Sequence, residues 1–426
     1  EQSAAHMADG FGRVSRKPGV CFATSGPGAT NILTGLATAQ ADSAPMIAVT
    51  GQVPVAMIGR DAFQESDIIG MANPVVKYAF QPRLPEEVPE AVKKGFYIAQ
   101  TGRPGPVLLD IPKDVQQNEA PMDFPDEFTI RGYHPWNDPD LASVQKAVDM
   151  LVNSERPIIL AGGGTIISSA FPELQSIAET LMIPVVTTFK GNGAFPENHP
   201  LSLGPIGMHG HAEANKMMAE ADCVLAIGTR FSDRSVGTFE AFEKRLKIIH
   251  MDVDPAEIGK NQTTSVAVVG DVRASLRIMV KLLLQRSVKK TEDSVWIKHV
   301  RETTDYWKEN LKLHPGEMGA AKILRKLREL LPKESVVTTE VGQHQMWASL
   351  FYDVIQPGTF FSSTGLGTMG WGFPASIGAK VARPDVPVVD IAGDGSFSMT
   401  ENSLATAVLE DIPVIVFILN NSTSDF

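Results

Sequence analysis

The chain has 426 residues and a formal net charge of −11, with 43% hydrophobic and 20% charged residues. This length is typical of about three domains, each large enough to bury a core. The acidic balance argues against nucleic acid as a main partner. No uninterrupted apolar run approaches the ~18 residues of a membrane span, so we expect no membrane insertion. An anionic ligand must then be bound by local basic residues, helix N-termini or a metal ion.

The two cysteines and the chain ends bear on the cellular compartment. Cys21 and Cys223 each lie in or beside an apolar run that predicts a strand. We expect core thiols in a reducing compartment, without a disulfide framework or a cysteine metal site. The chain starts in the helical pattern EQSAAHMADGFGRVS and stops just after a predicted strand, so we expect a fragment that lacks both termini. The predicted location is the cytoplasm, with an organellar targeting peptide in the missing N-terminus as the alternative.

Alternating apolar strands and amphipathic helices predict an α/β fold in three successive blocks. The runs VPVVDIAG and IPVIVFIL are typical of parallel strands buried on both faces, so we predict three doubly wound parallel sheets. The expected strands are residues 20–24, 45–50, 75–80 and 107–110, then 157–161, 184–188, 223–227, 247–252 and 266–269, then 335–339, 360–363, 386–391 and 413–419.

The predicted domains are residues 1–118, 143–287 and 316–426. A linker rich in Pro and Asp at 119–142 joins the first two, and a polar helical connection at 288–315 joins the last two.

Two polar motifs follow neighbouring strands of the third block. Gly393-Asp394-Gly395 ends one predicted strand, and Asn420-Asn421 close the next. A tight turn in which Asp394 caps a helix starting near Thr400 would explain the first motif but leaves the asparagines unexplained. In a parallel sheet both motifs face one crevice, where Mg²⁺ can take a few protein oxygens and complete its shell with phosphate. The pair therefore predicts a metal–diphosphate site.

Other glycine motifs are weaker. The segment GLGTMGWG contains Gly365-x-Gly367-x-x-Gly370, which alone matches a dinucleotide fingerprint and would favour a nicotinamide enzyme. TSGPGATN and LAGGGT each link a predicted strand to a helix, as tight turns or as contacts to an anion or nucleotide. The pair His209 and His211 lacks a third metal ligand.

Charged residues at two predicted strand ends have two interpretations each. GTRFSDRSVG places Arg230, Asp233 and Arg234 after a strand, where an arginine can bind a carboxylate in bidentate fashion or join a surface salt-bridge cluster. Arg103 and Lys113 flank another strand, and charges in such positions are usually only solvated.

The motifs TSGPGATN, TGQVP, DAFQE, GRPGPVLLDIPKD, GMHG, RFSDR, HMDVDPAEIGKN and VGQHQMW occur together with GDG and NN. In this combination the chain resembles the catalytic large subunit of acetohydroxyacid synthase (acetolactate synthase), a thiamine-diphosphate enzyme family, over essentially its whole length. The family has a pyrimidine-binding domain, a central FAD-binding Rossmann-like domain and a diphosphate-binding domain.

The resemblance implies roles for individual residues. Glu1 hydrogen-bonds the aminopyrimidine ring of the cofactor and promotes loss of the thiazolium proton, which is general acid–base work. Asp394, Asn421 and the main-chain carbonyl of Thr423 are the implied Mg²⁺ ligands. Phe63, Gln64 and Lys113 line the substrate approach, and Arg234 receives the carboxylate of the incoming 2-keto acid. Residues that contact thiamine diphosphate are Val341, Gly342, Gln343, His344, Gly367, Met369, Gly393, Gly395 and Ser396.

The resemblance also implies FAD in the central domain, with a structural role because carboligation needs no net redox step. The implied flavin contacts are Arg103, Gly163, Gly164, Thr188, Met208, His209, Asp252, Asp271 and Val272. The implied substrates are pyruvate and 2-ketobutyrate, for the biosynthesis of branched-chain amino acids. A homodimer or a dimer of dimers is expected, because this family builds its thiamine site from two subunits, and a small regulatory subunit is an expected partner.

Three other interpretations of the sequence are a flavin-containing pyruvate oxidase, a nicotinamide dehydrogenase and a non-catalytic homologue of the synthase. DAFQE and RFSDR favour the synthase over the oxidase, and the presence of Glu1, Asp394 and Asn421 argues against a degenerate homologue. Three features depart from the family: Ser3, Glu340 where Asp is usual, and STSDF after Asn421.

Overall fold

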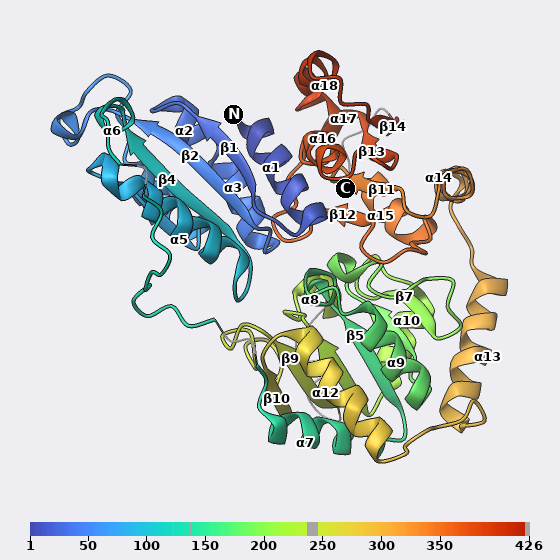
Figure 1. The fold of residues 1–426 in the computed structure, drawn as a ribbon. Helices are drawn as coiled ribbons and strands as arrows, with labels where there is room; N and C mark the ends of the chain where they lie inside the picture. The colour runs from blue at the N-terminus through green and yellow to red at the C-terminus, as the bar shows by residue number, and fades with distance from the viewer. Residues whose placement is uncertain (122, 136–137, 237–245, 422–426) are drawn as a thin grey trace. The chain divides into compact units, whose positions relative to one another are not determined.

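The computed structural model describes residues 1–121, 123–135, 138–236 and 246–421 (Figure 1). The chain forms two compact units. The first comprises Glu1–Pro135, Ser335–Gln345 and Phe361–Phe426, and the second comprises Trp136–Glu334 and Met346–Phe360. The structure contains three parallel sheets, so the predicted α/β fold class is confirmed. The predicted domain boundaries stay a prediction.

The first sheet has the strand order β1-β2-β4-β3. Alternate residues of β4 face opposite sides of the sheet. Leu108 lies in a core with the helices before and after β1, whereas Val107 and Leu109 pack with Ile98 of the long helix that precedes β4. Helices therefore cover both faces, as the continuous apolar strands require. The strands are β1 (Gly19–Ala23), β2 (Met46–Gln52), β3 (Tyr78–Phe80) and β4 (Pro106–Pro112). The helices are α1 (Gln2–Ser15), α2 (Pro27–Asn31), α3 (Leu33–Ala41), α4 (Ile68–Ala72), α5 (Val88–Gln100) and α6 (Lys113–Gln117).

The central sheet has six strands in the order β10-β9-β8-β5-β6-β7. Both cysteines are buried free thiols, Cys21 in the first sheet and Cys223 here, as predicted, and burial raises the pKa of each. The strands are β5 (Pro157–Ala161), β6 (Val185–Thr187), β7 (Ser202–Pro205), β8 (Cys223–Ile227), β9 (Lys247–Asp252) and β10 (Val266–Val269). The helices are α7 (Leu141–Val152), α8 (Gly163–Ile167), α9 (Phe171–Leu181), α10 (Ala212–Glu220), α11 (Asp233–Val236), α12 (Val272–Gln285), α13 (Val295–Asn310) and α14 (Pro315–Leu330).

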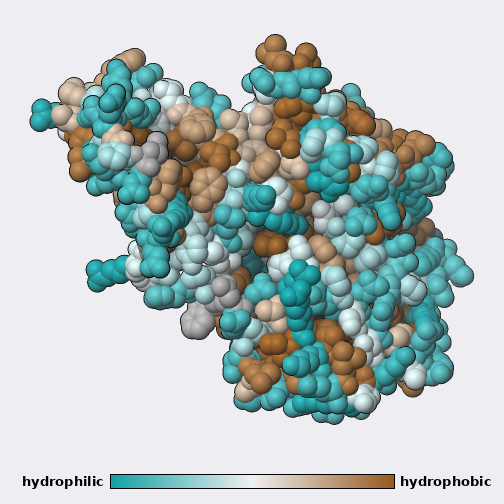
Figure 2. All heavy atoms as spheres, viewed as in Figure 1, coloured by the Kyte–Doolittle hydropathy of each residue, from teal (hydrophilic) through white to brown (hydrophobic). Residues whose placement is uncertain are grey.

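The third sheet has the order β12-β11-β13-β14. Its strands are β11 (Val336–Thr339), β12 (Phe360–Ser362), β13 (Val388–Gly393) and β14 (Ile415–Leu419). The helices are α15 (Gln343–Phe351), α16 (Gly372–Ala382), α17 (Asp394–Ser398) and α18 (Leu404–Leu409). The apolar residues Leu404, Val408, Leu409, Ile415 and Ile418 are exposed on α18 and β14, and Figure 2 shows apolar atoms at the surface there. Exposed apolar patches of this kind mark interaction surfaces.

Three details differ from the sequence-based expectations. The strand β7 was not predicted, because SLGP is short and has a polar first residue. The helix after the GDG motif begins at Asp394 rather than near Thr400, and its N-cap residue is Gly393, so Asp394 lies inside the helix. The polar connection becomes helical only at Val295. Among the described residues, no helix is both long and apolar enough to cross a membrane.

Within the first unit, α1 and α16 pack backbone to backbone. A Cβ on Gly378 would lie 1.9 Å from the Met7 carbonyl oxygen, and a Cβ on Gly10 would lie 2.2 Å from the Ala375 carbonyl oxygen. The two glycines therefore allow α1 of the first domain to lie directly against α16 of the third.

We expect Gly378→Ala to destabilise the protein by about 3 kcal/mol, because the new methyl group must push the two helices apart. Urea unfolding measures this change. The matched control is Gly319→Ala in α14, where a Cβ meets no atom within 4 Å. That substitution should stabilise the helix by about 0.5–1 kcal/mol. Equal effects of the two substitutions would contradict the close packing.

Candidate active site

The carboxyl ends of β13 and β14 carry the predicted metal ligands. The two strands are parallel, with Gly393 paired to Leu419, so Asp394 and Asn420-Asn421 begin at the same level on neighbouring strands. The Asn421 Nδ2 donates to Gln343 Oε1 at 3.1 Å, and Gln343 is the first residue of α15. The structure thus brings Asp394, Asn421 and Gln343 to one edge of the sheet. Thr423 lies outside the described residues.

His344 lies beside this edge and is buried. A Cβ on Gly393 would lie 2.5 Å from His344 Nδ1, and a Cβ on Gly342 would lie 2.8 Å from His344 Cε1. Burial lowers the pKa of His344 to about 4, although a hydrogen bond to the Glu340 backbone and the nearby Asp394 charge raise it. The ring is therefore neutral at neutral pH, and its Nε2 atom is buried without a hydrogen-bond partner.

The open positions around this edge fit a diphosphate. A Cβ on Gly395 or on Gly367 would meet no atom within 4 Å, and Gly367 has φ +70°, which favours glycine. The buried His344 Nε2 atom has no hydrogen-bond partner in the protein, and a bound group with polar oxygens would supply one. The open space beside Gly395 and Gly367 would accommodate such a group. No cluster of three His, Cys, Asp or Glu residues suited to a metal occurs in the described part of the chain. A magnesium ion that shares phosphate oxygens needs only one or two carboxylates.

Glu340 is buried directly behind the diphosphate edge. Its carboxylate accepts hydrogen bonds from Gly370 N (2.8 Å), Phe373 N (2.9 Å) and Ser396 Oγ (2.7 Å). Burial raises the pKa of Glu340, which these donors partly offset. Burial and the nearby Glu340 also raise the pKa of Asp390 well above its usual range. Glu340 therefore joins Gly370 in the loop before α16 and Phe373 at the start of α16 to Ser396 of α17.

Glu1 occupies the N-cap of α1 and reaches the glycine turn that follows β1. Its Oε2 atom accepts a hydrogen bond from Asn31 Nδ2 at 3.4 Å, and its Oε1 atom would lie 3.7 Å from a Cβ on Gly28. The side chain is exposed. The structure thus places Glu1 at the turn of TSGPGATN, with its carboxylate accessible to a ligand.

The segment between β2 and α4 carries Phe63 and Gln64. Phe63 is 89% exposed, and Gln64 has φ +60° and lies against Gly26. At the neighbouring end of β4, Asp110 is buried and accepts hydrogen bonds from Thr50, Gln52 and Gln81. Because Gln52 Nε2 also donates to the Ser66 carbonyl at 2.9 Å, Asp110 helps to fix the segment that presents Phe63. Lys113 follows β4 and is exposed.

The predicted flavin contacts, apart from Arg103, lie at one edge of the central sheet. Each follows the carboxyl end of a parallel strand: Gly163 and Gly164 after β5, Thr188 after β6, Met208 and His209 after β7, Asp252 at the end of β9, and Asp271 and Val272 after β10. Arg234 follows β8 at the same edge. Arg103 belongs to the first unit, where its Nε donates to Ser43 Oγ at 2.8 Å.

Buried polar atoms near this edge lack protein partners. Both side-chain polar atoms of Asn192 and the hydroxyls of Thr165 and Thr187 are buried without hydrogen bonds. They flank the turns after β5 and β6, so the edge fits a polar nucleotide-like group. Arg234 is 67% exposed and lies 3.9 Å from Asp233. Burial and the nearby Arg234 lower the pKa of His209.

His6 makes the first unit sensitive to acid. It is fully buried in α1, and burial lowers its pKa from 6.5 to about 4. Between these two values the folded protein binds fewer protons at His6 than the unfolded chain does, so stability falls as the pH drops through this window. We expect the wild-type protein to lose about 2 kcal/mol more than His6→Gln on going from pH 7.5 to pH 5. Urea unfolding at both pH values measures this, and parallel losses would contradict it.

Three domain families of thiamine pyrophosphate enzymes match the chain. They are the N-terminal TPP binding domain at residues 1–71, the central domain at 144–279 and the C-terminal TPP binding domain at 340–426. With three parallel sheets in this order, the protein is a thiamine-diphosphate enzyme. It is 47% identical to the probable acetolactate synthase large subunit of Methanocaldococcus jannaschii, over 99% of this chain and 73% of the relative. It is 45% identical to the acetolactate synthase large subunit of Parasynechococcus marenigrum (99% and 68%) and 43% identical to acetolactate synthase 3, chloroplastic, of Brassica napus (99% and 65%). The chain belongs to the acetolactate synthase large-subunit family.

These matches confirm the family, the acetolactate synthase function and the thiamine diphosphate cofactor predicted from the sequence. The roles of individual residues, Mg²⁺ and FAD stay predictions. Sequence reasoning missed the buried groups that support the site, such as Asp110, Asp42 and Asn192. Nothing in the local sequence pattern distinguishes them from exposed polar residues. A signal that could have been used is the spacing of Asp9 and Arg13, four residues apart in α1, which is typical of an ion pair on a helix.

Proposed function

We propose that this protein decarboxylates pyruvate and joins the resulting hydroxyethyl unit to a second 2-keto acid, pyruvate or 2-ketobutyrate, in branched-chain amino acid biosynthesis. The observation that carries the proposal is the register of β13 and β14, which brings Asp394 and Asn421 to adjacent strand ends beside Gln343. Thiamine diphosphate, when bound, supplies a carbon nucleophile and an electron sink.

In this proposal Asp394, Asn421 and the Thr423 carbonyl hold Mg²⁺, and Gln343 and His344 lie along the diphosphate. Support comes from the orphaned His344 Nε2 and from the open space at Gly367 and Gly395. Because ionised carboxylate is a hard ligand, Asp394 supplies the charge that attracts the metal. Met369 and the remaining residues of the two glycine turns complete the contacts with the cofactor.

The Glu1 carboxylate would hydrogen-bond the aminopyrimidine ring of thiamine diphosphate and act there as the acid–base group. Its position over the Gly26–Gly28 turn, where Asn31 donates a hydrogen bond to its Oε2 atom, leaves the carboxylate oriented for a ligand. Phe63, Gln64 and Lys113 are exposed after β2 and β4, and they border the substrate approach. Arg234 binds the carboxylate of the second 2-keto acid, because its guanidinium can donate two parallel hydrogen bonds.

FAD occupies the carboxyl edge of the central sheet in a structural role. The glycine turn after β5 and the orphaned polar atoms of Asn192, Thr165 and Thr187 support a nucleotide-like ligand there. The redox-active part of the flavin has no step to perform in a carboligation.

The proposed assembly is a homodimer or a dimer of dimers that also binds a small regulatory subunit. The words "large subunit" in the names of two relatives and the exposed apolar residues of α18 and β14 support association. The proposed location is the cytoplasm. Two buried free thiols fit its reducing conditions, and an organelle is the alternative that the name of the Brassica napus relative suggests.

The test is an assay of a full-length protein with thiamine diphosphate, Mg²⁺ and pyruvate, with FAD added or withheld. Acetolactate and the absorbance of the flavin are measured in the same sample. We expect acetolactate to form only with FAD, while the flavin stays oxidised. Bleaching of the flavin with little acetolactate would overturn the proposal and indicate a pyruvate oxidase.

A further inference from the structure

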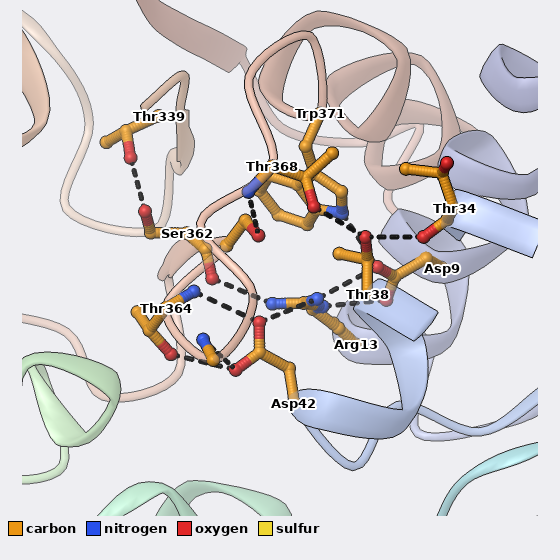
Figure 3. Close-up of polar contacts among 12 residues, drawn as sticks. Asp9, Arg13, Thr34, Thr38, Asp42, Thr339, Ser362, Thr364, Thr368 and Trp371 are labelled. Atoms are coloured by element: carbon orange, nitrogen blue, oxygen red, sulfur yellow. Dashed lines mark hydrogen bonds and ion pairs between the residues drawn. The ribbon is translucent and has the colours of Figure 1, made fainter. Parts of the chain in front are cut away.

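A buried cluster of charged residues joins the first and third domains inside the first unit. We call Asp9, Arg13, Asp42 and Trp371 the Arg13 cluster. Arg13 donates from Nε and Nη2 to the two Asp9 oxygens at 2.7 and 2.8 Å, and its Nη2 lies 3.1 Å from Asp42 Oδ2. Trp371 Nε1 donates to Asp9 Oδ2 at 2.7 Å, and the Arg13 guanidinium lies 4.4 Å from the Trp371 ring centre. Figure 3 shows Arg13 between the two aspartates.

The cluster holds one loop, residues 362–371, at several points. Arg13 Nη1 donates to the Ser362 carbonyl at 2.8 Å, where the loop begins. Asp42 accepts hydrogen bonds from Thr364 N, Thr364 Oγ1 and Gly365 N at 3.1, 2.8 and 3.0 Å. Trp371, where the loop ends, is the ring that Asp9 and Arg13 fix. The start, the first turn and the end of this loop are therefore all held by side chains of the first domain (Figure 3).

Two further contacts hold the second half of the loop. The hydroxyls of Thr38 and Thr368 lie 2.7 Å apart, and Gly370 N donates to Glu340 at 2.8 Å. Residues 365–367 remain exposed, and the space around Gly367 is open. The loop is thus held on both sides of Leu366 and Gly367, which form its exposed tip and lead to Met369.

The same contacts extend to the diphosphate edge. Ser362, whose carbonyl Arg13 binds, has its hydroxyl 2.6 Å from both Thr339 Oγ1 and Gln345 Nε2. Gln345 lies on α15, two residues after Gln343. Helix α1, which begins after Glu1, therefore reaches through Arg13 to both groups of proposed cofactor contacts in the third domain.

We propose that the Arg13 cluster is a positioning device for thiamine diphosphate, which fixes the 362–371 loop so that its tip is already in place when the cofactor binds. The inference rests on the proposed function for the role of Gly367 and Met369. Arg13 and the two aspartates do not touch the cofactor; they act through the loop. Preorganisation of a loop increases affinity because less ordering remains to be done on binding.

A purely structural cluster would stabilise the fold without affecting the loop tip or the cofactor, so the test compares two buried arginines. Arg328 of α14 is the matched control: it donates to Tyr352 Oη, Leu331 O and Pro332 O, and lies 5.1 Å from the Tyr352 ring centre. It is also buried, but it belongs to the second unit. Arg328→Met therefore removes the same kind of group from the unit that does not contain the loop.

The experiment uses Asp42→Ala, Asp42→Asn, Arg13→Met and Arg328→Met. Hydrogen exchange of peptides covering 362–371 is measured without cofactor, and thiamine diphosphate affinity is titrated at saturating Mg²⁺. For Asp42→Ala and Arg13→Met we expect exchange at least about tenfold faster, including Gly370, and affinity about tenfold weaker. Asp42→Asn keeps an acceptor oxygen, so its exchange rate and its cofactor affinity should lie between those of the wild type and those of Asp42→Ala. Arg328→Met should lower the melting temperature and leave both loop readouts unchanged.

Unchanged exchange and affinity in folded Asp42→Ala would overturn the inference, and so would equal losses in Arg328→Met. Where Asp42→Ala or Arg13→Met does not fold, Thr38→Val replaces it, because it keeps the shape of the side chain and removes only its hydroxyl, which contacts Thr368 and donates to the Thr34 carbonyl of the same helix. Hydrogen exchange of residues 362–371 and thiamine diphosphate affinity are then measured on Thr38→Val, and unchanged values would overturn the inference. A wild-type protein that does not bind thiamine diphosphate would overturn the proposed function, whereas the exchange data, taken without cofactor, still decide whether the cluster holds the loop.

Discussion

Replacing Glu1 with glutamine should lower kcat for acetolactate formation by about 10²–10⁴-fold, the usual contribution of a positioned acid–base group. Glutamine keeps a hydrogen-bonding oxygen of the same reach but cannot exchange a proton. Because Glu1 is exposed at the N-cap of α1 and makes no side-chain cap, the substitution should leave the stability of the helix nearly unchanged. Steady-state kinetics with pyruvate and urea unfolding measure the two effects.

The matched control is Glu86→Gln, an exposed glutamate in the turn before α5, for which we expect wild-type kinetics. A second control is Asn31→Ala, which removes the group that donates to Glu1 Oε2. It should raise KM or lower kcat less than Glu1→Gln, since the carboxylate itself remains. Wild-type kcat in Glu1→Gln would contradict the proposed role of this residue.

The strands could be predicted because their physical signal is local. The run VPVVDIAG appears as β13 and is buried on both faces, as predicted. The run IPVIVFIL forms β14 at the expected place, but the prediction that it is buried on both faces was wrong, because β14 is the edge strand and exposes Ile415 and Ile418. The strand β7 could not be predicted, because SLGP has no such run and forms a strand by pairing with β6. The helix of the GDG motif starts at Asp394 because Gly393 adopts an extended N-cap conformation, which the sequence does not specify.

The candidate site also contains features that could be predicted from the sequence and features that could not. The parallel register of β13 and β14 was implied by the sequence, so the meeting of Asp394 and Asn421 was predictable. The Arg13 cluster was not, because Arg13 and Trp371 are hundreds of residues apart and approach only when α1 packs on α16. The glycines that permit this packing, Gly10 and Gly378, look like ordinary helix-weakening residues until the facing backbone is known.

Replacing Asp394 with asparagine should raise the Mg²⁺ concentration needed for thiamine diphosphate binding by about 10²-fold or more, because the metal loses its charged ligand while the shape of the side chain is kept. Asp394 is half-buried at the first turn of α17, and its backbone position is set by β13, so the fold should survive the change. Cofactor binding titrated at increasing Mg²⁺ measures the shift directly, without relying on turnover.

The matched control is Asp411→Asn in the turn before β14, an exposed aspartate with φ +52° that asparagine tolerates. It changes the net charge by the same amount in the same domain, so a general electrostatic effect would appear in both variants. A shift confined to Asp394→Asn locates the metal at the end of β13. If both variants kept the wild-type Mg²⁺ dependence, the carboxylate at the strand end would not be a metal ligand, and the register of β13 and β14 would position the asparagines for another purpose.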